Sequence, residues 1–259
     1  MTHLLLLALA ITPVDWLTDA ATAEKKLAAA RAPYVYRERQ MNWNLDNKGQ
    51  KKKDEPSVTR VYEHIFLEGA PYKQLIENNG RKLSGSELNK RDEARMKEAA
   101  KRQEDRRLRK PFLPGNRSVR LGKLEELAKA YHLKLAGEET VAGFPCVIIE
   151  ADPNGLADTP LNKELQSYRQ RIWIHRDLKV LVQRAVEVIG PDSEILPGSV
   201  LTFRWAPLPE SDGIWFETGH EFNFGSTVYG VRKIRGIQRH EFYDYRRFQV
   251  ESSITVEPL

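Results

Sequence analysis

A histidine and an aspartate lie two positions apart in the segment RIWIHRDLKVLVQRAVEVI, which spans residues 171–189. A carboxylate beside a histidine can orient the imidazole and stabilise its protonated form, which is how many general bases work. The same HRD triplet begins the catalytic loop of protein kinases, but the sequence lacks the glycine-rich loop, the DFG motif and the downstream asparagine. Apolar and β-branched residues flank the triplet on both sides. The pattern therefore predicts a solvated turn, 175–179, between paired strands at 172–174 and 180–188.

The other residues that could do chemistry form no motif of catalysis or metal binding. The six histidines make no HExxH motif and no pair at metal-ligand spacing, so no metal site is predicted. Cys146 is the single cysteine, which excludes an internal disulfide, and its apolar surroundings predict a buried, inert thiol. The segment GNRSVRLGK lacks the glycine spacing of a phosphate-binding loop, and Leu161 stands where a calcium loop needs an acid. No cofactor is predicted, and the sequence favours a non-enzymatic protein; a hydrolase with a dispersed site stays open as an alternative.

The amino-terminal residues predict export from the cytoplasm. Leu4 to Ile11 form a wholly apolar run that is too short to span a bilayer and is typical of the core of a secretion signal. We therefore expect residues 1–12 to be a signal segment and the protein to be periplasmic or exported; the alternative is a buried amino-terminal helix. The chain as a whole is 41% hydrophobic and 30% charged, which leaves enough apolar material for the remaining residues, 13–259, to form one globular domain.

Alternating strand-like segments dominate this domain. Helices are predicted at 15–31 and 123–131, and strands at 34–45, 58–67, 72–77, 132–153 with a turn at Ala142–Gly143, 171–189, 199–208, 213–224 and 228–250. Strands do not alternate with helices, which excludes a doubly wound parallel sheet. The sequence thus predicts a mainly β (α+β) fold: an incomplete antiparallel β-barrel, or strongly curved sheet, with covering helices.

A long charged helix interrupts the strands at residues 84–111. Ser84 and Glu87 fit a capping box, and Pro111 supplies a stop. From Glu87 to Lys110 there are ten Lys or Arg residues against six Asp or Glu, many at helical pair spacing. The helix contains no aromatic residue to stack on bases, so nucleic acid is not an expected partner. We expect a solvated helix, with a membrane surface or a protein partner as open alternatives for residues 86–110.

Many aromatic residues fall on the predicted strands. One face of a curved sheet must meet a second layer, a helix or a ligand. Two interpretations stay open: the aromatic residues fill an ordinary core, or some of them line a cavity for a lipid or acyl chain. The cavity candidates are Trp43, Phe66, Trp173, Phe203, Trp205, Trp215, Phe222 and Phe224.

The order of several segments resembles a known superfamily. GFPCVIIEA, RIWIHRD, LKVLVQRAVEV, GIWFETGHEF and YDYRRFQVESSITV follow one another as in LolA/LolB-like proteins, the outer-membrane lipoprotein-sorting group. His175 takes the place of the aspartate that usually follows the tryptophan strand in that group. The segment GAPYKQLIENNGRKLSGSEL with its charged helix resembles uncharacterised exported bacterial proteins of this type, and the whole likeness covers about residues 32–255. The resemblance implies an incomplete barrel around a hydrophobic cavity and a periplasmic carrier or sensor of lipid or lipoprotein.

These observations together predict an exported, non-enzymatic protein that binds a lipid or an acylated protein in a barrel cavity. The main alternative is a protein-interaction or scaffold module that acts through the charged helix.

Overall fold

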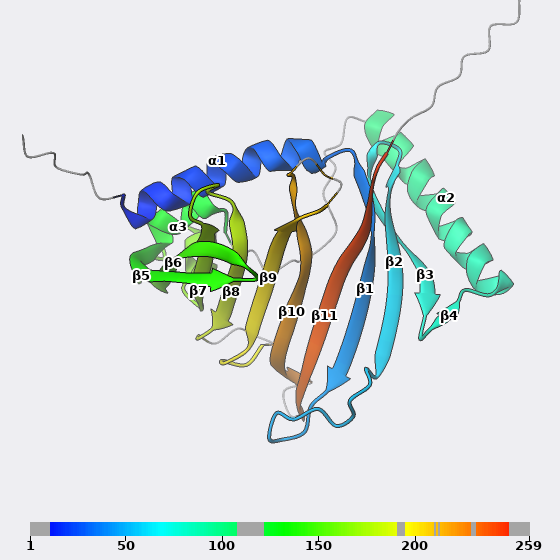
Figure 1. The fold of residues 1–259 in the computed structure, drawn as a ribbon. Coiled ribbons are helices and arrows are strands. Elements are labelled where there is room, and N and C mark those ends of the chain that lie inside the picture. The colour runs from blue at the N-terminus through cyan, green and yellow to red at the C-terminus, as the bar shows by residue number, and fades with distance from the viewer. Residues whose placement is uncertain are drawn as a thin grey trace, which may run out of the picture.

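The computed structural model describes residues 11–107, 122–190, 195–209, 211, 213–228 and 232–248. Most of the expected signal segment, residues 1–10, and the end of the expected charged insertion, residues 108–111, lie outside the described residues. The described chain forms one antiparallel sheet of eleven strands in the order β4-β3-β2-β1-β11-β10-β9-β8-β7-β6-β5, together with four helices (Figure 1). The sheet is curved and does not close, which confirms the predicted fold class. No helix within the described ranges is both long and apolar enough to cross a membrane.

The elements follow the predicted order. The helices are α1 (Pro13–Arg31), α2 (Gly85–Arg107), α3 (Leu124–Ala130) and α4 (Pro160–Leu165). The strands are β1 (Tyr34–Asn44), β2 (Val58–Leu67), β3 (Ala70–Asn78), β4 (Arg81–Lys82), β5 (Tyr131–Val141), β6 (Phe144–Pro153), β7 (Tyr168–His175), β8 (Leu181–Val188), β9 (Val200–Pro207), β10 (Trp215–Val228) and β11 (Arg232–Arg247). Two short elements, α4 and the two-residue strand β4, have no counterpart in the sequence prediction, because so few residues show no helical or strand period.

Capping residues set the starts of the two long helices. Thr12 precedes α1, and its hydroxyl accepts from the backbone N–H of Asp15 while the Asp15 carboxylate accepts from the Thr12 backbone N–H. Ser84 precedes α2, and its backbone N–H and hydroxyl both donate to the Glu87 carboxylate at 2.7 Å. The Ser84–Glu87 pair that was expected to begin the charged helix is therefore in place.

The HRD triplet forms a structural turn. β7 includes His175 as its last residue and β8 begins at Leu181, so the connection has the expected length but lies one residue later, at 176–180. The Nδ1 atom of His175 accepts from the backbone N–H groups of Asp177 and Leu178, at 3.2 and 3.3 Å, and the ring packs against Trp215. Burial lowers the pKa of His175, which favours the neutral imidazole that can accept these bonds. The triplet thus caps a turn.

One face of the sheet carries most of the helices, and we call it the helix face. Residues directly opposite each other in neighbouring strands share a face. Across the sheet, Ile149, Ile172, Arg184, Phe203 and His220 are successive partners on β6, β7, β8, β9 and β10, and His240 on β11 continues the row. This row belongs to the helix face.

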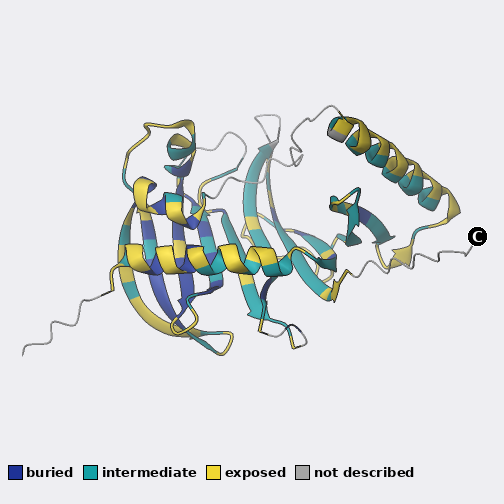
Figure 2. Ribbon diagram, turned by 90° about the horizontal axis from the view of Figure 1, so that it is seen from above, coloured by how far each residue is buried: buried dark blue, intermediate teal, exposed yellow. Residues whose placement is uncertain are grey.

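The helix face of β5, β6, β7 and β8 is buried under α1, α3 and α4, and we call it the covered half (Figure 2). Its side chains are mainly aliphatic, and most are almost fully buried, which gives the close packing of a protein interior. The members of this core are Trp16, Leu17, Ala20, Ala21, Leu124, Leu127, Ala130, Tyr131, Val147, Ile149, Ala151, Leu165, Ile172, Ile174 and Leu181.

A closed polar network lies within this core. The Arg184 guanidinium donates to the Gln170 side chain at 2.8 Å and to the carbonyl of Gly122 at 3.2 Å. Gln170 donates to the Tyr131 hydroxyl, which in turn donates to the Leu165 carbonyl, each at 2.9 Å. Burial lowers the pKa of Arg184 to about 10, so the guanidinium stays charged at neutral pH. The network joins β5, β7 and β8 to α4 and to the loop before α3.

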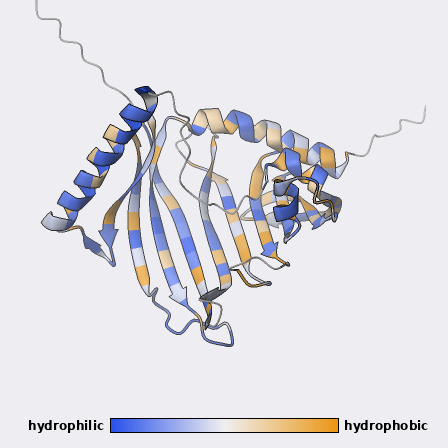
Figure 3. Ribbon diagram, turned by 180° about the vertical axis from the view of Figure 1, so that it is seen from behind, coloured by the Kyte–Doolittle hydropathy of each residue, from blue (hydrophilic) through white to orange (hydrophobic). Residues whose placement is uncertain are grey.

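Helix α2 lies beside the β3–β4 edge of the sheet and is strongly hydrophilic (Figures 1 and 3). Arg102 anchors it, because its guanidinium donates to the carbonyls of Leu67, Ala70 and Pro71 at the β2–β3 turn, at 3.0–3.1 Å. The outward side of the helix is exposed, including Met96. The expected helix is thus present and largely exposed, and side-chain bonds join it to the sheet at both ends, through Arg102 and through the pair of Glu87 with Arg81 of β4.

Candidate functional site

The helix face continues over β9, β10, β11, β1, β2 and β3, which we call the uncovered half. Among the described residues, no helix packs extensively against β9, β10, β11, β1 or β2 (Figures 1 and 2). Most side chains here are half-buried rather than buried. This half of the face is therefore the part of the sheet that is open to a ligand.

Five of the eight aromatic cavity candidates lie on the helix face. Phe222 and Phe224 alternate along β10 and their rings stack at 5.2 Å, while Phe203 and Trp205 on β9 stack at 6.0 Å. Trp205 also packs against the core of the covered half. Phe66 on β2 contacts the ring of Phe248 at 5.6 Å. These four residues of β9 and β10 form what we call the aromatic set: Phe203, Trp205, Phe222 and Phe224. Phe66 lies farther along the uncovered half, on β2.

The other three candidates lie outside this aromatic set. Trp43 is on the opposite face, where its indole donates to the Asp54 carbonyl at 2.9 Å. Trp173 is also on the opposite face, and its indole donates to the Glu139 carboxylate. Trp215 is buried at the start of β10, with its ring 4.7 Å from that of Phe144. Each of these three has interactions within the chain that account for its burial.

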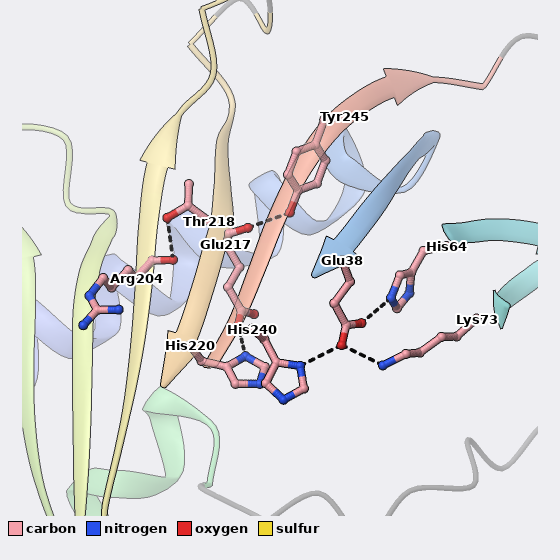
Figure 4. Close-up of polar contacts among 9 residues, drawn as sticks. All are labelled: Glu38, His64, Lys73, Arg204, Glu217, Thr218, His220, His240 and Tyr245. Carbon is pink, nitrogen blue, oxygen red and sulfur yellow. Dashed lines mark hydrogen bonds and ion pairs between the residues drawn. The ribbon is translucent and has the colours of Figure 1, made fainter. Parts of the chain in front are cut away.

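A histidine–carboxylate cluster lies on the uncovered half (Figure 4). The Glu38 carboxylate on β1 accepts from three side chains: His64 Nε2 at 2.6 Å, Lys73 Nζ at 2.7 Å and His240 Nδ1 at 2.7 Å. Figure 4 shows His64 and Lys73 approaching this carboxylate from one side and His240 from the other. The side chain of Glu38 is only 4% exposed. Three strands thus direct donors at one buried carboxylate.

The hydrogen bonds determine the charge of Glu38. Burial alone would raise its pKa, but the bonds from His240, His64 and Lys73 outweigh burial and hold the pKa well below its usual range. An ionised carboxylate only accepts hydrogen bonds, so His64 Nε2 and His240 Nδ1 are the protonated nitrogens of their rings. In the neutral form of each ring, the second nitrogen is then an acceptor.

A second histidine–carboxylate pair lies directly beside the first. His220 Nδ1 on β10 bonds to the Glu217 carboxylate at 2.8 Å, and the rings of His220 and His240 stack at 4.3 Å. A β-bulge makes this pair possible: Glu217 lies opposite Trp205 and His220 opposite Phe203, with an extra residue in β10 between them. Without the bulge, Glu217 and His220 would point to opposite faces. Gly219 occupies the bulge, where an added Cβ would collide with the His240 carbonyl.

Two half-buried tyrosines flank the two pairs. Tyr36 stacks on His64 at 4.3 Å and on Tyr245 at 5.0 Å. Burial raises the pKa of Tyr36 to about 12, helped by the negative charges of Glu38 and Glu217. Burial also raises the pKa of Tyr245, whose hydroxyl donates to the Glu217 carbonyl at 2.5 Å. Both phenols therefore stay neutral, and their rings give the cluster apolar walls.

The arrangement suits hydrogen bonding to a ligand better than metal binding. Among the residues that the structure describes, no group of three or more His, Cys, Asp or Glu side chains could hold a metal ion. Each imidazole, however, has one nitrogen bonded to a carboxylate and a second nitrogen that is not used in that bond. Such rings can accept a hydrogen bond or take up a proton.

Sequence reasoning missed this cluster. Glu38, His64 and His240 are far apart in the chain and match no motif. The available signal was the strand alternation: it placed His64 on the same side of β2 as Tyr62 and Phe66, and it puts Glu38 on the side of β1 that carries Tyr36. Glu38 and His64 each lie on a strand face with aromatic residues, where a polar side chain needs a hydrogen-bond partner. The sequence alone could not show that β1 and β2 are neighbours that bring the two side chains together.

Comparison with known proteins gives structural similarity only. No family model and no curated protein sequence matches the chain. Among solved structures, a DUF1329 family protein from Desulfovibrio piger is similar with 17% identity and a TM-score of 0.38, covering 95% of each chain. A LolA superfamily protein from Nitrosomonas europaea is similar with 9% identity and a TM-score of 0.36, covering 96% of this chain and 99% of that one. The lipoprotein LppX of Mycobacterium tuberculosis is similar with 9% identity and a TM-score of 0.29, covering 90% and 94%. The superfamily that the sequence resembles is thus among the matched structures, and at these TM-scores the matches carry no argument about function.

Proposed function

We propose that this protein is an exported, non-enzymatic binding protein that accommodates the acyl part of a lipid or an acylated protein on the uncovered half. The observation that carries the proposal is the contrast within one sheet face. On the covered half, helices bury the aliphatic side chains; on the uncovered half, Phe203, Phe222 and Phe224 face outward with no described helix packed on them. An acyl chain would supply the missing apolar layer.

The expected energetics fit such a ligand. Each methylene that leaves water for an apolar surface contributes about 0.8 kcal/mol. A chain of roughly ten methylenes would gain up to about 8 kcal/mol, part of which is lost to ordering the chain. Half-buried rings are suited to this role because they remain accessible and lose little entropy when a ligand binds.

Mass spectrometry of lipids extracted from natively purified protein tests the proposal directly, and titration with a fluorescent fatty acid measures the affinity. We expect co-purifying lipid and saturable binding. The double variant Phe222→Ala/Phe224→Ala should weaken the fluorescent fatty acid's binding at least tenfold. Tyr243→Ala is the matched control, because Tyr243 is an aromatic residue of β11 on the opposite face. No lipid and no saturable binding would refute the proposal, as would equal losses in both variants.

A hydrolase is the second candidate, and the histidine–carboxylate pairs favour it. A histidine oriented by a carboxylate is the arrangement of a general base. If His220 or His240 acts in this way, the purified protein should hydrolyse an acyl ester such as p-nitrophenyl butyrate, and one of the two variants His220→Asn and His240→Asn should abolish turnover. The binding proposal expects no turnover by the wild-type protein.

A further inference from the structure

We propose that the two stacked histidine–carboxylate pairs form a head-group site for an uncharged, hydroxyl-rich amphiphile, with a sugar or polyol as its polar end. The inference rests on the proposed function and specifies the ligand's polar end. The site consists of His220 with Glu217, and of His240 and His64 with Glu38. It adjoins the aromatic set, because the rings of Phe203 and His220 are 5.4 Å apart.

The cluster offers hydrogen-bond acceptors to a ligand. In each of the three rings, one nitrogen donates to a carboxylate, so the second nitrogen of the neutral ring has a free lone pair. The side chains of His64, His220 and His240 are 18%, 24% and 13% exposed, so solvent or a ligand can reach them. A ligand that satisfies these acceptors must bring donors of its own.

Hydroxyl donors fit better than an ammonium group. The cation position beside Glu38 is already taken by the chain's own Lys73, whose ammonium also lies 4.0 Å from the centre of the Tyr62 ring. A ligand ammonium beside Glu38 would be repelled by the positive charge of Lys73. Hydroxyl groups meet no such repulsion, and the flanking rings of Tyr36 and Phe242 suit the apolar faces of a sugar.

An anionic head group fits poorly. A phosphate would meet the carboxylates of Glu38 and Glu217, and the cluster's one ammonium is already bonded to Glu38. A further cation, Arg60, is exposed and lies across β1 from His240, with Gln40 between the two. It is therefore separated from the acceptor nitrogens by a strand.

Three probes that share one alkyl chain separate the contribution of the head group to binding from that of the alkyl chain. Dodecyl maltoside, dodecyl phosphate and dodecylamine carry a hydroxyl-rich, an anionic and a cationic head, and each is titrated below its aggregation concentration by calorimetry at pH 8. We expect the maltoside to bind at least tenfold more tightly than either charged probe, a difference equal to about one net hydrogen bond.

Two asparagine variants identify the residues responsible. In His220→Asn and His240→Asn, the amide can take the place of Nδ1 and keep the donor to the carboxylate, while the second ring nitrogen is removed. Both variants should bind the three probes within about threefold of one another. His132→Asn, at an exposed histidine on the opposite face of β5, is the control and should keep the wild-type preference.

The outcomes distinguish the two proposals. If none of the probes binds, the proposed function itself fails. If all three bind with equal affinity, or if the phosphate or the amine binds most tightly, the acyl proposal stands and the head-group inference is overturned. A wild-type preference for maltoside that both asparagine variants retain would also overturn it.

Discussion

The two halves of the helix face lie on different strands of one sheet, and the sheet uses them in opposite ways. On the covered half, buried side chains are mostly aliphatic, and the polar groups of Arg184, Gln170 and Tyr131 donate to partners inside the core. On the uncovered half, aromatic rings are half-buried, and the histidines near Glu38 use one nitrogen each in bonds to carboxylates. The covered half is closed by its own helices, whereas the uncovered half leaves aromatic surface and ring nitrogens accessible, as the binding proposal requires.

The largest expected effect is on the covered half. Ile172 is fully buried, so Ile172→Ala should lower the free energy of unfolding by about 4 kcal/mol through lost burial and the cavity left behind. Urea denaturation followed by circular dichroism measures the change. A loss below about 1 kcal/mol would show that this half is not the stability core.

The next largest effect concerns the carboxylate at the centre of the cluster. Glu38→Gln should destabilise the protein by about 3 kcal/mol at neutral pH, because three donors lose an ionised acceptor. The pKa of Glu38 is lower in the folded chain than its ordinary value of 4.5, so the ionised form contributes stability above that pH. The contribution is lost as the pH falls below 4.5 toward the folded pKa.

Unfolding free energies of wild type and Glu38→Gln, measured between pH 7 and pH 3, check this dependence. The difference between the two proteins should shrink on acidification. A difference that stays constant over this range would contradict the assigned role of the charge. Glu221→Gln is a suitable control, because Glu221 forms an ion pair with Arg239 on the face of the sheet opposite the helix face, away from the Glu38 cluster.

A smaller effect is expected at the bulge. Gly219→Ala introduces a Cβ into the space of the His240 carbonyl, so β10 and β11 must shift, at a cost of about 2 kcal/mol. The shift should also disturb the Glu217–His220 pair, which nuclear magnetic resonance would detect as changed imidazole shifts of His220. Unchanged imidazole signals would show that the bulge does not hold this pair in place.

The smallest effect on stability is expected for the aromatic residues of the uncovered half. Phe222→Ala should cost about 1 kcal/mol or less, because the ring is already partly in water. Under the acyl-binding proposal, the same change should weaken binding of a fluorescent fatty acid about tenfold. A stability loss as large as that of Ile172→Ala would remove the distinction between the halves.

Much of the fold was predictable because its signals are local. The alternation in β2 and the capping pair Ser84–Glu87 depend on residues near one another in the chain, and both were confirmed. The apolar run around Cys146 correctly indicated a buried thiol. Each of these features can be read within a window of about ten residues.

The candidate site was less predictable because it depends on strand order. β1 lies between β2 and β11, so Glu38 meets His64 from the neighbouring hairpin and His240 from the far end of the chain. No local pattern encodes that adjacency. Alternation also failed at Glu217, where the bulge changes which face the side chain occupies. The structure also places two of the aromatic candidates, Trp43 and Trp173, on the face opposite the helix face. Which face a strand residue occupies depends on how its strand is paired with its neighbours, and no single strand sequence shows that pairing.

The bulge in β10 also has a consequence for how this strand can change over time. Thr218 is in effect a one-residue insertion, and deleting it would restore regular alternation. Glu217 and His220 would then lie two positions apart and would still share the helix face, opposite Trp205 and Phe203. The bulge therefore lets β10 carry one more residue without moving Glu217 off that face. A homologue one residue shorter at this point should retain the sheet, its aromatic set and both histidine–carboxylate pairs.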